Sequence, residues 1–277
     1  MASPSLPTAR PSLTPGTPVV EFRDVSLAFE QNQILQHVSF CVRHGETRIL
    51  LGPAGGGKSV LMKLANGLIA PDSGEIRIFD RPLAEMSERE LFDMRAHIGM
   101  VFQESALFDS LSVEDNVAYR LHEEHVSESE AHDRVVEALR FVELEHAISK
   151  FPSELSGGMR RRVSIARAII SHPDLILYDS PTGGLDPITS TTIIELIIKQ
   201  RDVSRTTSLL ITHRLQDAFT LATHRYNQRD ARMELIPDGG LDPGTRFLVL
   251  HEGHIVFDGT TTELTRGTDP WLRQFLS

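Results

Sequence analysis

Residues 48–59 read RILLGPAGGGKS, and this stretch decides how the chain is expected to fold. A short apolar run leads into a glycine-rich loop, and text of helical character follows from about Lys58 to Leu68. Strand, loop and helix in this order are the setting in which the pattern G-x4-G-K-[ST] binds phosphate. The matching positions are Gly52, Pro53, Ala54, Gly55, Gly56, Gly57, Lys58 and Ser59.

The composition of this loop suits a nucleotide polyphosphate with Mg²⁺. Glycines let backbone N–H groups converge on phosphate oxygens, and the N-terminus of the following helix adds a positive partial charge. Lys58 can reach the β- and γ-phosphates, and the Ser59 hydroxyl can ligate Mg²⁺. Val60 lies where many such loops carry a second hydroxyl, so we expect one phosphate contact fewer. A flexible glycine-rich turn is the alternative, which the order of strand, loop and helix disfavours.

A second apolar run, LILYD at 175–179, ends in an aspartate. A strand that ends in Asp is weak evidence alone. Combined with the glycine loop, it predicts that Asp179 holds Mg²⁺ directly or through water.

The next residue, Ser180, departs from what a nucleotide hydrolase normally carries there, a glutamate that polarises the attacking water. Serine cannot act as a general base unaided near neutral pH, and loss of such a group lowers the rate by about 10²–10⁴. Two interpretations stay open. Either His213 positions the water with the Ser180 hydroxyl bridging, or ATP binding with slow hydrolysis serves as the switch.

Residues 155–159, LSGGM, precede the arginine-rich amphipathic stretch RRRVSIARAII. Ser156 and two glycines at a helix start combine a hydroxyl, bare amides and the helix dipole, which makes a second anion site. An N-capped helix without further role is the alternative, and the proximity of the Asp179 strand favours the anion site.

Taken together, these motifs resemble those of an ABC-type ATPase domain over about residues 19–264. The resemblance implies that Phe29 stacks on adenine, that Gln103 senses Mg²⁺ and contacts a membrane subunit, and that His213 is the switch histidine. It also implies a head-to-tail dimer. In that dimer, the second copy's phosphate would meet Ser156, Gly157 and Gly158, and the loop at Leu185 and Asp186 would cross the interface. The cofactors implied are ATP and Mg²⁺. Arg214 replaces an Asp that often follows the switch histidine.

The expected fold class is α/β, a P-loop NTPase of the ABC type. Strand-like and helical segments alternate, which predicts a mostly parallel core sheet. An antiparallel hairpin turning at Gln31–Gln33 begins the domain, and a helical subdomain is inserted at about 87–170. The predicted divisions are a disordered tail (1–17), the ATPase domain (18–264) and a C-terminal extension (265–277). Residues 223–246 are expected to form a surface excursion of unknown purpose.

The composition of the chain limits which kinds of partner and which location are expected for it. The chain has 277 residues, of which 40% are hydrophobic and 24% charged, as in a globular protein with a sizeable core. A net charge of -10 disfavours nucleic acid. Cys41 is the only cysteine, and no run approaches the roughly 18 apolar residues of a membrane span. We therefore expect a cytoplasmic protein, peripheral on the inner face of the cell membrane if it serves a transporter.

Finer features resemble the ATPase subunit of Mla-type phospholipid transporters. They are FQESALFDSLSVEDNVAYRL, LSGGMRRRVSIARAI and the C-terminal TDPWLRQFLS. That resemblance implies an integral-membrane permease and an MCE-type lipid-binding protein as partners. Two alternatives remain: an ATP-binding regulatory module with little hydrolysis, which Ser180 suggests, and a soluble ABC ATPase without a transporter.

Overall fold

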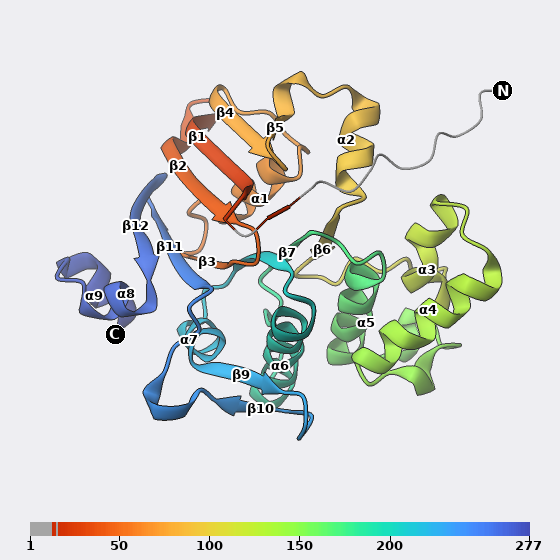
Figure 1. The fold of residues 1–277 in the computed structure, drawn as a ribbon. Coiled ribbons are helices and arrows are strands. Elements are labelled where there is room, and N and C mark those ends of the chain that lie inside the picture. Colours follow the sequence, from red (N-terminus) through yellow and green to blue (C-terminus); the bar gives the residue numbers. More distant parts are fainter. Residues whose placement is uncertain (1–12, 15) are drawn as a thin grey trace.

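The computed structural model describes residues 13–14 and 16–277, which form a layered α/β structure (Figure 1). Its strands are β1 (Pro18–Phe29), β2 (Asn32–Arg43), β3 (Thr47–Leu51), β4 (Ser73–Ile78), β5 (Arg81–Pro82), β6 (Ile98–Val101), β7 (Leu175–Asp179), β8 (Thr207–Ile211), β9 (His224–Asn227), β10 (Arg232–Leu235), β11 (Thr245–His251) and β12 (His254–Thr260). Its α-helices are α1 (Lys58–Ala65), α2 (Glu88–Arg95), α3 (Val113–Glu123), α4 (Glu128–Phe141), α5 (Gly157–Ile169), α6 (Pro187–Ser204), α7 (Leu215–Thr223), α8 (Thr261–Arg266) and α9 (Pro270–Leu276).

A six-stranded sheet forms the centre, in the order β12-β11-β3-β8-β7-β6. The strands from β11 to β6 run parallel, and only β12 pairs antiparallel. The mostly parallel core sheet is therefore confirmed. The edge strand β6 lies within 87–170, where the sequence predicted mostly helix. The sequence did not reveal this strand, because four residues are too few to establish a strand period.

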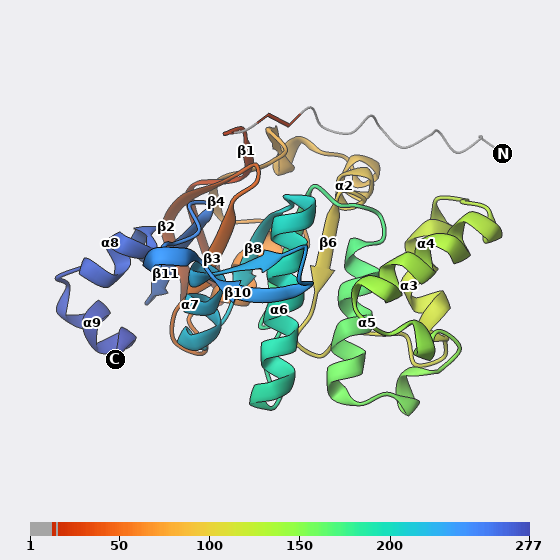
Figure 2. The same cartoon turned by 60° about the horizontal axis from the view of Figure 1, so that its bottom comes forward.

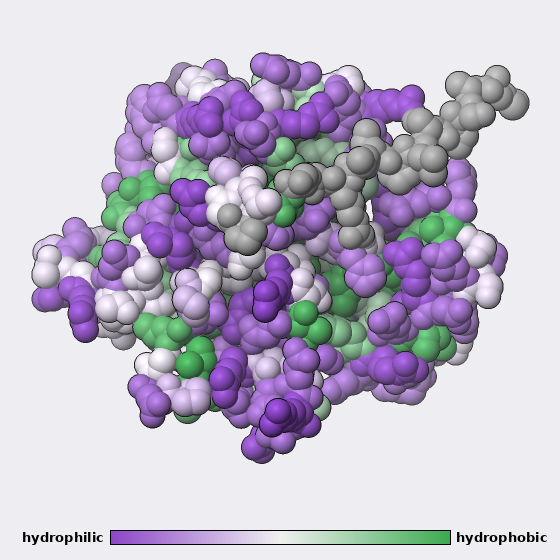
Figure 3. Space-filling view, viewed as in Figure 1, coloured by the Kyte–Doolittle hydropathy of each residue, from purple (hydrophilic) through white to green (hydrophobic). Residues whose placement is uncertain are grey.

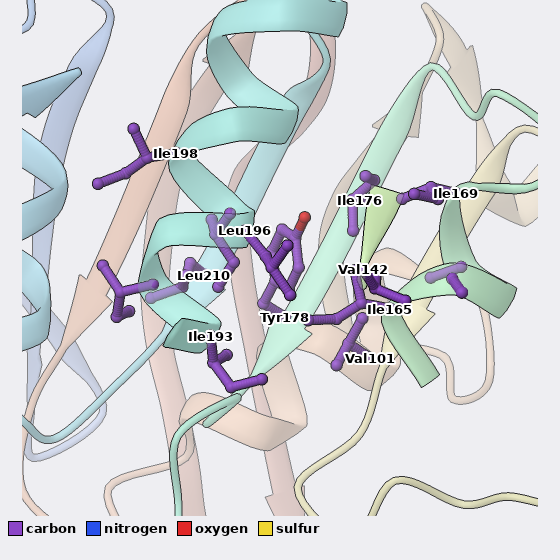
Figure 4. Packing of buried hydrophobic residues seen from close by; sticks show 14 of the residues in the cluster. Val101, Val142, Ile165, Ile169, Ile176, Tyr178, Ile193, Leu196, Ile198 and Leu210 are labelled. Atoms are coloured by element: carbon purple, nitrogen blue, oxygen red, sulfur yellow. The ribbon is translucent and has the colours of Figure 1, made fainter. Parts of the chain in front are cut away.

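Side chains alternate along the central strands and divide the core into two clusters. In β7, Ile176 and Tyr178 face one cluster, whereas Leu175 and Leu177 face the other. On the first face, α5 and α6 pack against the sheet, and Tyr178 lies among their isoleucine and leucine side chains (Figure 4). A strand buried on both faces reads as a continuous apolar run, which explains LILYD and TRILL.

The second face of the core sheet packs against α1 and a four-stranded antiparallel sheet in the order β2-β1-β4-β5. Strands β1 and β2 pair from Pro18 opposite Arg43 to Phe29 opposite Asn32. This is the predicted hairpin, with a β-bulge or irregularity between Phe22 and Val25. The antiparallel sheet places Phe29 at the end of β1.

Helices α3, α4 and α5 gather on one side of the molecule, beyond β6 (Figures 1 and 2). Serine side chains at the N-caps start three helices of this region, at Ser112, Ser127 and Ser156. A capping box starts α2, since Ser87 and Glu90 each accept from the other's backbone N–H.

The predicted surface excursion contains the antiparallel pair β9–β10, followed by a 3₁₀ turn. Arg201 on α6 is buried and ties this region to the core. It donates to the carbonyl oxygens of Leu221 and His224 and pairs with Asp242 at 3.4 Å. The excursion is therefore anchored before and at the start of its hairpin and again at Asp242, after the hairpin has ended.

At the C-terminus, Trp271 of α9 stacks on His251 with ring centroids 3.8 Å apart, so part of the predicted extension packs on the chain's own β11. Most of the predicted tail, residues 1–12 and 15, lies outside the described residues. Leu13 packs against the cluster beside the antiparallel sheet.

The visible face in Figure 3 is largely hydrophilic, with small separate apolar patches. In the part of the chain that the structure describes, no helix has the length and apolar character needed to cross a membrane.

Candidate functional site

A cavity of about 470 Å³ opens at the carboxyl edge of the parallel strands. Strands β3, β6, β7 and β8 each end here, and the segments that follow them supply its wall. Ligands of open parallel sheets bind at this edge, because the loops after the strands converge there. Its lining residues are Phe29, Ile34, Ala54, Gly55, Gly56, Gly57, Lys58, Ser59, Val60, Gln103, Ser180, Ile211 and His213.

The glycine loop reaches α1 through Gly57, whose φ of 90° is left-handed and makes glycine the natural N-cap. Gly52 and Pro53 do not line the cavity. Gly52 approaches β11 so closely that a Cβ would lie 2.3 Å from the Leu250 oxygen. The loop is therefore held against the sheet at Gly52, whereas its residues 54–59 line the cavity.

Lys58 is a buried cation at the cavity wall, with 8% exposure. Its ammonium donates to the carbonyl oxygens of Gly52 at 2.9 Å and Pro53 at 2.6 Å. Burial lowers the pKa of Lys58, and the nearby Asp179 carboxylate opposes that shift. Among the residues that the structure describes, no carboxylate is in hydrogen-bond contact with Lys58, and a buried cation in this situation suits a polyanionic ligand.

Asp179 ends β7 and does not itself line the cavity, whereas Ser180 does. The Ser180 hydroxyl donates to Asp179 Oδ1 at 3.4 Å. Ser180 has a φ of 48°, in the left-handed region, and its N–H donates to the Ile211 carbonyl. Ser180 thereby lies at a sharp bend of the backbone and lines the cavity together with Gln103 and His213. Among the described lining residues there is no Asp or Glu.

Sequence reasoning missed Arg161, a buried residue on α5. Its guanidinium donates to the carbonyl oxygens of Phe102, Gln103 and Ser180, so one side chain joins two walls of the cavity. Burial lowers its pKa, and Glu104 opposes this shift. The sequence shows that the helix after LSGGM is rich in arginine, but it does not show which arginine contacts the cavity. The hydrogen-bond partners of Arg161 lie 19, 58 and 59 positions away in the chain.

Ser156, Gly157, Gly158 and Asp186 do not border this cavity. Ser156 caps α5 by accepting from the Met159 N–H at 3.2 Å. Asp186 caps α6 and accepts from the N–H groups of Ile188 and Thr189 at 3.0 Å each. Hydrogen bonds from the Thr189 hydroxyl and backbone lower the pKa of Asp186. The expected N-cap at Ser156 is therefore present, Asp186 caps α6 in the same way, and neither residue borders the cavity of its own chain.

Gly157 and Gly158, the two glycines of the LSGG motif, differ in their surroundings, and this difference predicts different effects of alanine on stability. A Cβ at Gly158 would lie 2.4 Å from Thr189 Cγ2 on α6, whereas one at Gly157 would meet nothing nearer than 3.8 Å. We expect Gly158→Ala to lower the free energy of unfolding by about 1–3 kcal/mol through overpacking. Gly157→Ala, the matched control, should leave it unchanged or raise it, since alanine favours helix. Denaturant unfolding of both variants measures the difference.

A compensating change tests the cause. Thr189→Ser removes the obstructing methyl and keeps the hydroxyl that donates to Asp186. The Gly158→Ala/Thr189→Ser variant should regain most of the lost stability. Equal stabilities of Gly158→Ala and Gly157→Ala would contradict this account.

The phosphate-binding loop follows β3, the strand that ends in Asp179 lies in the same mostly parallel sheet, and the capped LSGG helix packs against that sheet. This combination defines an ATP-binding cassette ATPase. The ABC transporter family profile matches residues 35–183. The chain belongs to this family and is the ATP-hydrolysing subunit of an ABC transporter.

Named relatives span most of the chain. It is 39% identical over 267 residues to protein TRIGALACTOSYLDIACYLGLYCEROL 3, chloroplastic, of Arabidopsis thaliana, covering 93% of this chain and 73% of that one. It is 35% identical to the intermembrane phospholipid transport system ATP-binding protein MlaF of Escherichia coli (93% and 88% covered). It is also 35% identical to the probable ribonucleotide transport ATP-binding protein mkl of Mycobacterium leprae (93% and 68% covered).

Solved cassettes share the fold. A dimeric ATP-binding cassette in a post-hydrolysis state with ADP and Pi superimposes with a TM-score of 0.73 at 27% identity, over 87% of this chain and 98% of that one. The structure of cbiO1 from Clostridium perfringens, part of the ABC transporter complex cbiONQ, superimposes with a TM-score of 0.73 at 26% identity, over 90% of this chain and 91% of that one.

Proposed function

We propose that ATP occupies the cavity at the carboxyl edge of the sheet, with its phosphates on the amides of residues 54–59 and its adenine against Phe29. The observation that carries this proposal is the buried Lys58 beside a glycine-lined cavity. Phe29 is 49% exposed at the cavity rim, as expected of a ring that stacks on a ligand. Val60 offers no hydroxyl, so its contact is through the backbone.

The residues present fit an Mg²⁺ ion. Ser59 and Gln103 line the cavity, and the Asp179 carboxylate lies near enough to Lys58 to influence its pKa. These three would supply the oxygen ligands that Mg²⁺ prefers. The ion, when bound, would neutralise charge on the phosphate oxygens.

We propose that two copies of the chain pair head to tail across ATP. Ser156 and Gly157 are exposed and lie outside the chain's own cavity, so they are free to meet phosphate on a second copy. Ile188, beside the Asp186 loop, is 82% exposed. A second subunit that covers Ile188 would remove this apolar surface from water.

Water activation in this site would proceed without a glutamate. Gln103, Ser180 and His213 supply the hydrogen-bonding side chains at the phosphate end of the cavity. They would orient the water, while the cations stabilise developing charge. Hydrolysis is accordingly expected to be slow.

For the transported substrate we propose phospholipid, moved through a separate membrane permease with an MCE-type lipid-binding protein. The relative MlaF is named for phospholipid transport and supports this choice. The chain would bind the permease on the cytoplasmic face of the membrane. ATP-dependent movement of labelled phospholipid in vesicles that contain the purified complex tests the proposal. Transport of ribonucleotide instead, as the name of mkl suggests for that relative, would overturn it.

A groove beside β6 is our proposed permease site. It encloses about 320 Å³ between α2, α3 and α5. Phe102, Phe108 and Tyr119 line it and are 37–44% exposed. Gln103 follows Phe102 directly, so a segment in the groove would lie next to the nucleotide cavity.

The charge of this groove indicates its partner's chemistry. Arg95, Arg120 and Arg167 line it, and none of the described lining residues is acidic, while Glu124, outside the lining, pairs with Arg120 at 2.7 Å. Arg167 lies over the Phe108 ring and donates to the Ser105 carbonyl. Burial lowers the pKa of Arg167. An apolar segment of the permease with an acidic side chain would complement both the rings and the charge.

We expect Arg167→Glu to weaken co-purification of the permease at least about 10-fold, because a reversed charge repels the acidic partner. The matched control is Arg232→Glu, on the exposed β10 strand remote from the groove. Basal ATP hydrolysis by the isolated chain should change less than about twofold in Arg167→Glu. Normal permease recovery with that variant would rule out the groove as the charged contact.

A further inference from the structure

We propose that Arg214 is a positioning residue that holds His213 in register with the loop carrying Ser180. Arg214 stands where an Asp often follows the switch histidine, and the proposed function assigns it no role. The inference rests on that proposed function, in which His213 and Ser180 face the reacting phosphate.

The Arg214 guanidinium joins two helix starts. Its Nη1 donates to Ser190 Oγ on α6 at 2.6 Å, and its Nε lies 3.6 Å from the Asp217 carboxylate on α7. Both partners are buried, Ser190 at 2% and Asp217 at 4% exposure. We call this set, completed by Thr182, the Arg214 bridge.

Each end of the bridge continues into the loop after β7. The Thr182 hydroxyl donates to the same Asp217 carboxylate, and Thr182 lies two positions after Ser180. Ser190 donates to the Leu185 carbonyl at 3.4 Å, in the segment predicted to cross the dimer interface. At the other side, the Arg214 N–H donates to Thr212 Oγ1 at 3.0 Å, which turns the chain at His213.

The Arg214 bridge therefore fixes the distance between the loop that carries Ser180 and the turn that carries His213. Such a device matters more in this chain than in one with a carboxylate at 180. A glutamate can hold water by itself, whereas here the water depends on the relative placement of several side chains. A displacement of about 1 Å in such a site can lower the rate by about 10²-fold.

Steady-state ATP hydrolysis by the purified full-length chain tests the role. We expect Arg214→Ala to lower kcat about 10-fold with KM for ATP changed less than twofold, and Arg214→Lys to recover part of the loss. Arg225→Ala, an arginine paired with Glu234 on the β9–β10 hairpin, is the matched control and should leave kcat unchanged.

A double variant separates positioning from general stability. In a His213→Ala background, Arg214→Ala should have no further effect on kcat, because the residue that it positions is gone. An unchanged kcat in Arg214→Ala, or the same fold loss in both backgrounds, would overturn the inference. If Arg214→Ala does not fold, Ser190→Ala removes one arm of the bridge and should lower kcat about threefold. An unchanged kcat in His213→Ala itself would instead refute the proposed role of His213.

Discussion

The Ser180→Glu variant is expected to hydrolyse ATP about 10²-fold faster than the natural chain, because a positioned general base contributes about 10²–10⁴ in rate. Position 180 is already part of the cavity wall, so a glutamate there would border the cavity. Ser180 already lines the cavity together with Gln103 and His213, and its hydroxyl donates to Asp179, the proposed Mg²⁺ ligand. Phosphate release at saturating ATP measures the gain. KM for ATP should change little, since position 180 is assigned to water and not to the nucleotide.

Ser180→Gln is the matched control for this experiment. Glutamine has the size of glutamate and cannot accept a proton, so its kcat should stay near that of the natural chain. The glutamate variant should also lose activity as pH falls and its carboxylate becomes protonated, a limb absent from the glutamine variant. If the two variants hydrolyse ATP equally slowly, the natural side chains already supply all the activation that this site can use.

Lys58→Ala is expected to lower kcat by about 10²–10³, the usual consequence of removing one preorganised group that faces developing charge. Lys58 is a buried cation of the cavity wall, and its ammonium donates to the loop carbonyls of Gly52 and Pro53. ATP binding should weaken as well, because the γ-phosphate loses a charged partner. Hydrolysis rate and nucleotide affinity are both measured on the purified chain.

Lys63→Ala provides the control, since Lys63 is exposed on the same helix α1 and is not among the residues that line the cavity. It should match the natural chain in rate and in unfolding temperature. Turnover by Lys58→Ala within threefold of the natural chain would contradict the assignment of the cavity to the ATP phosphates.

The positions that were predictable from sequence are those whose behaviour depends on near neighbours. The glycine loop, the Ser156 cap, the Asp186 cap and the Ser87 box each involve backbone groups within three or so residues of the side chain. The parallel core was predictable for a similar reason, because buried strands read as uninterrupted apolar runs. The strand β6 and the hairpin β9–β10 were not predictable in this way, since each of these three strands has four residues and lacks a sustained hydrophobic period.

By itself the sequence determined the family, the phosphate loop and the absence of glutamate at 180, because these are properties of consecutive residues. Only the tertiary structure decided that Gln103, Ser180 and His213 share one cavity, and that Arg161 and Arg214 tie its walls together. Those contacts join segments far apart in the chain. They arise from the order and register of parallel strands, whose carboxyl ends are brought to one edge by pairing that no local pattern encodes.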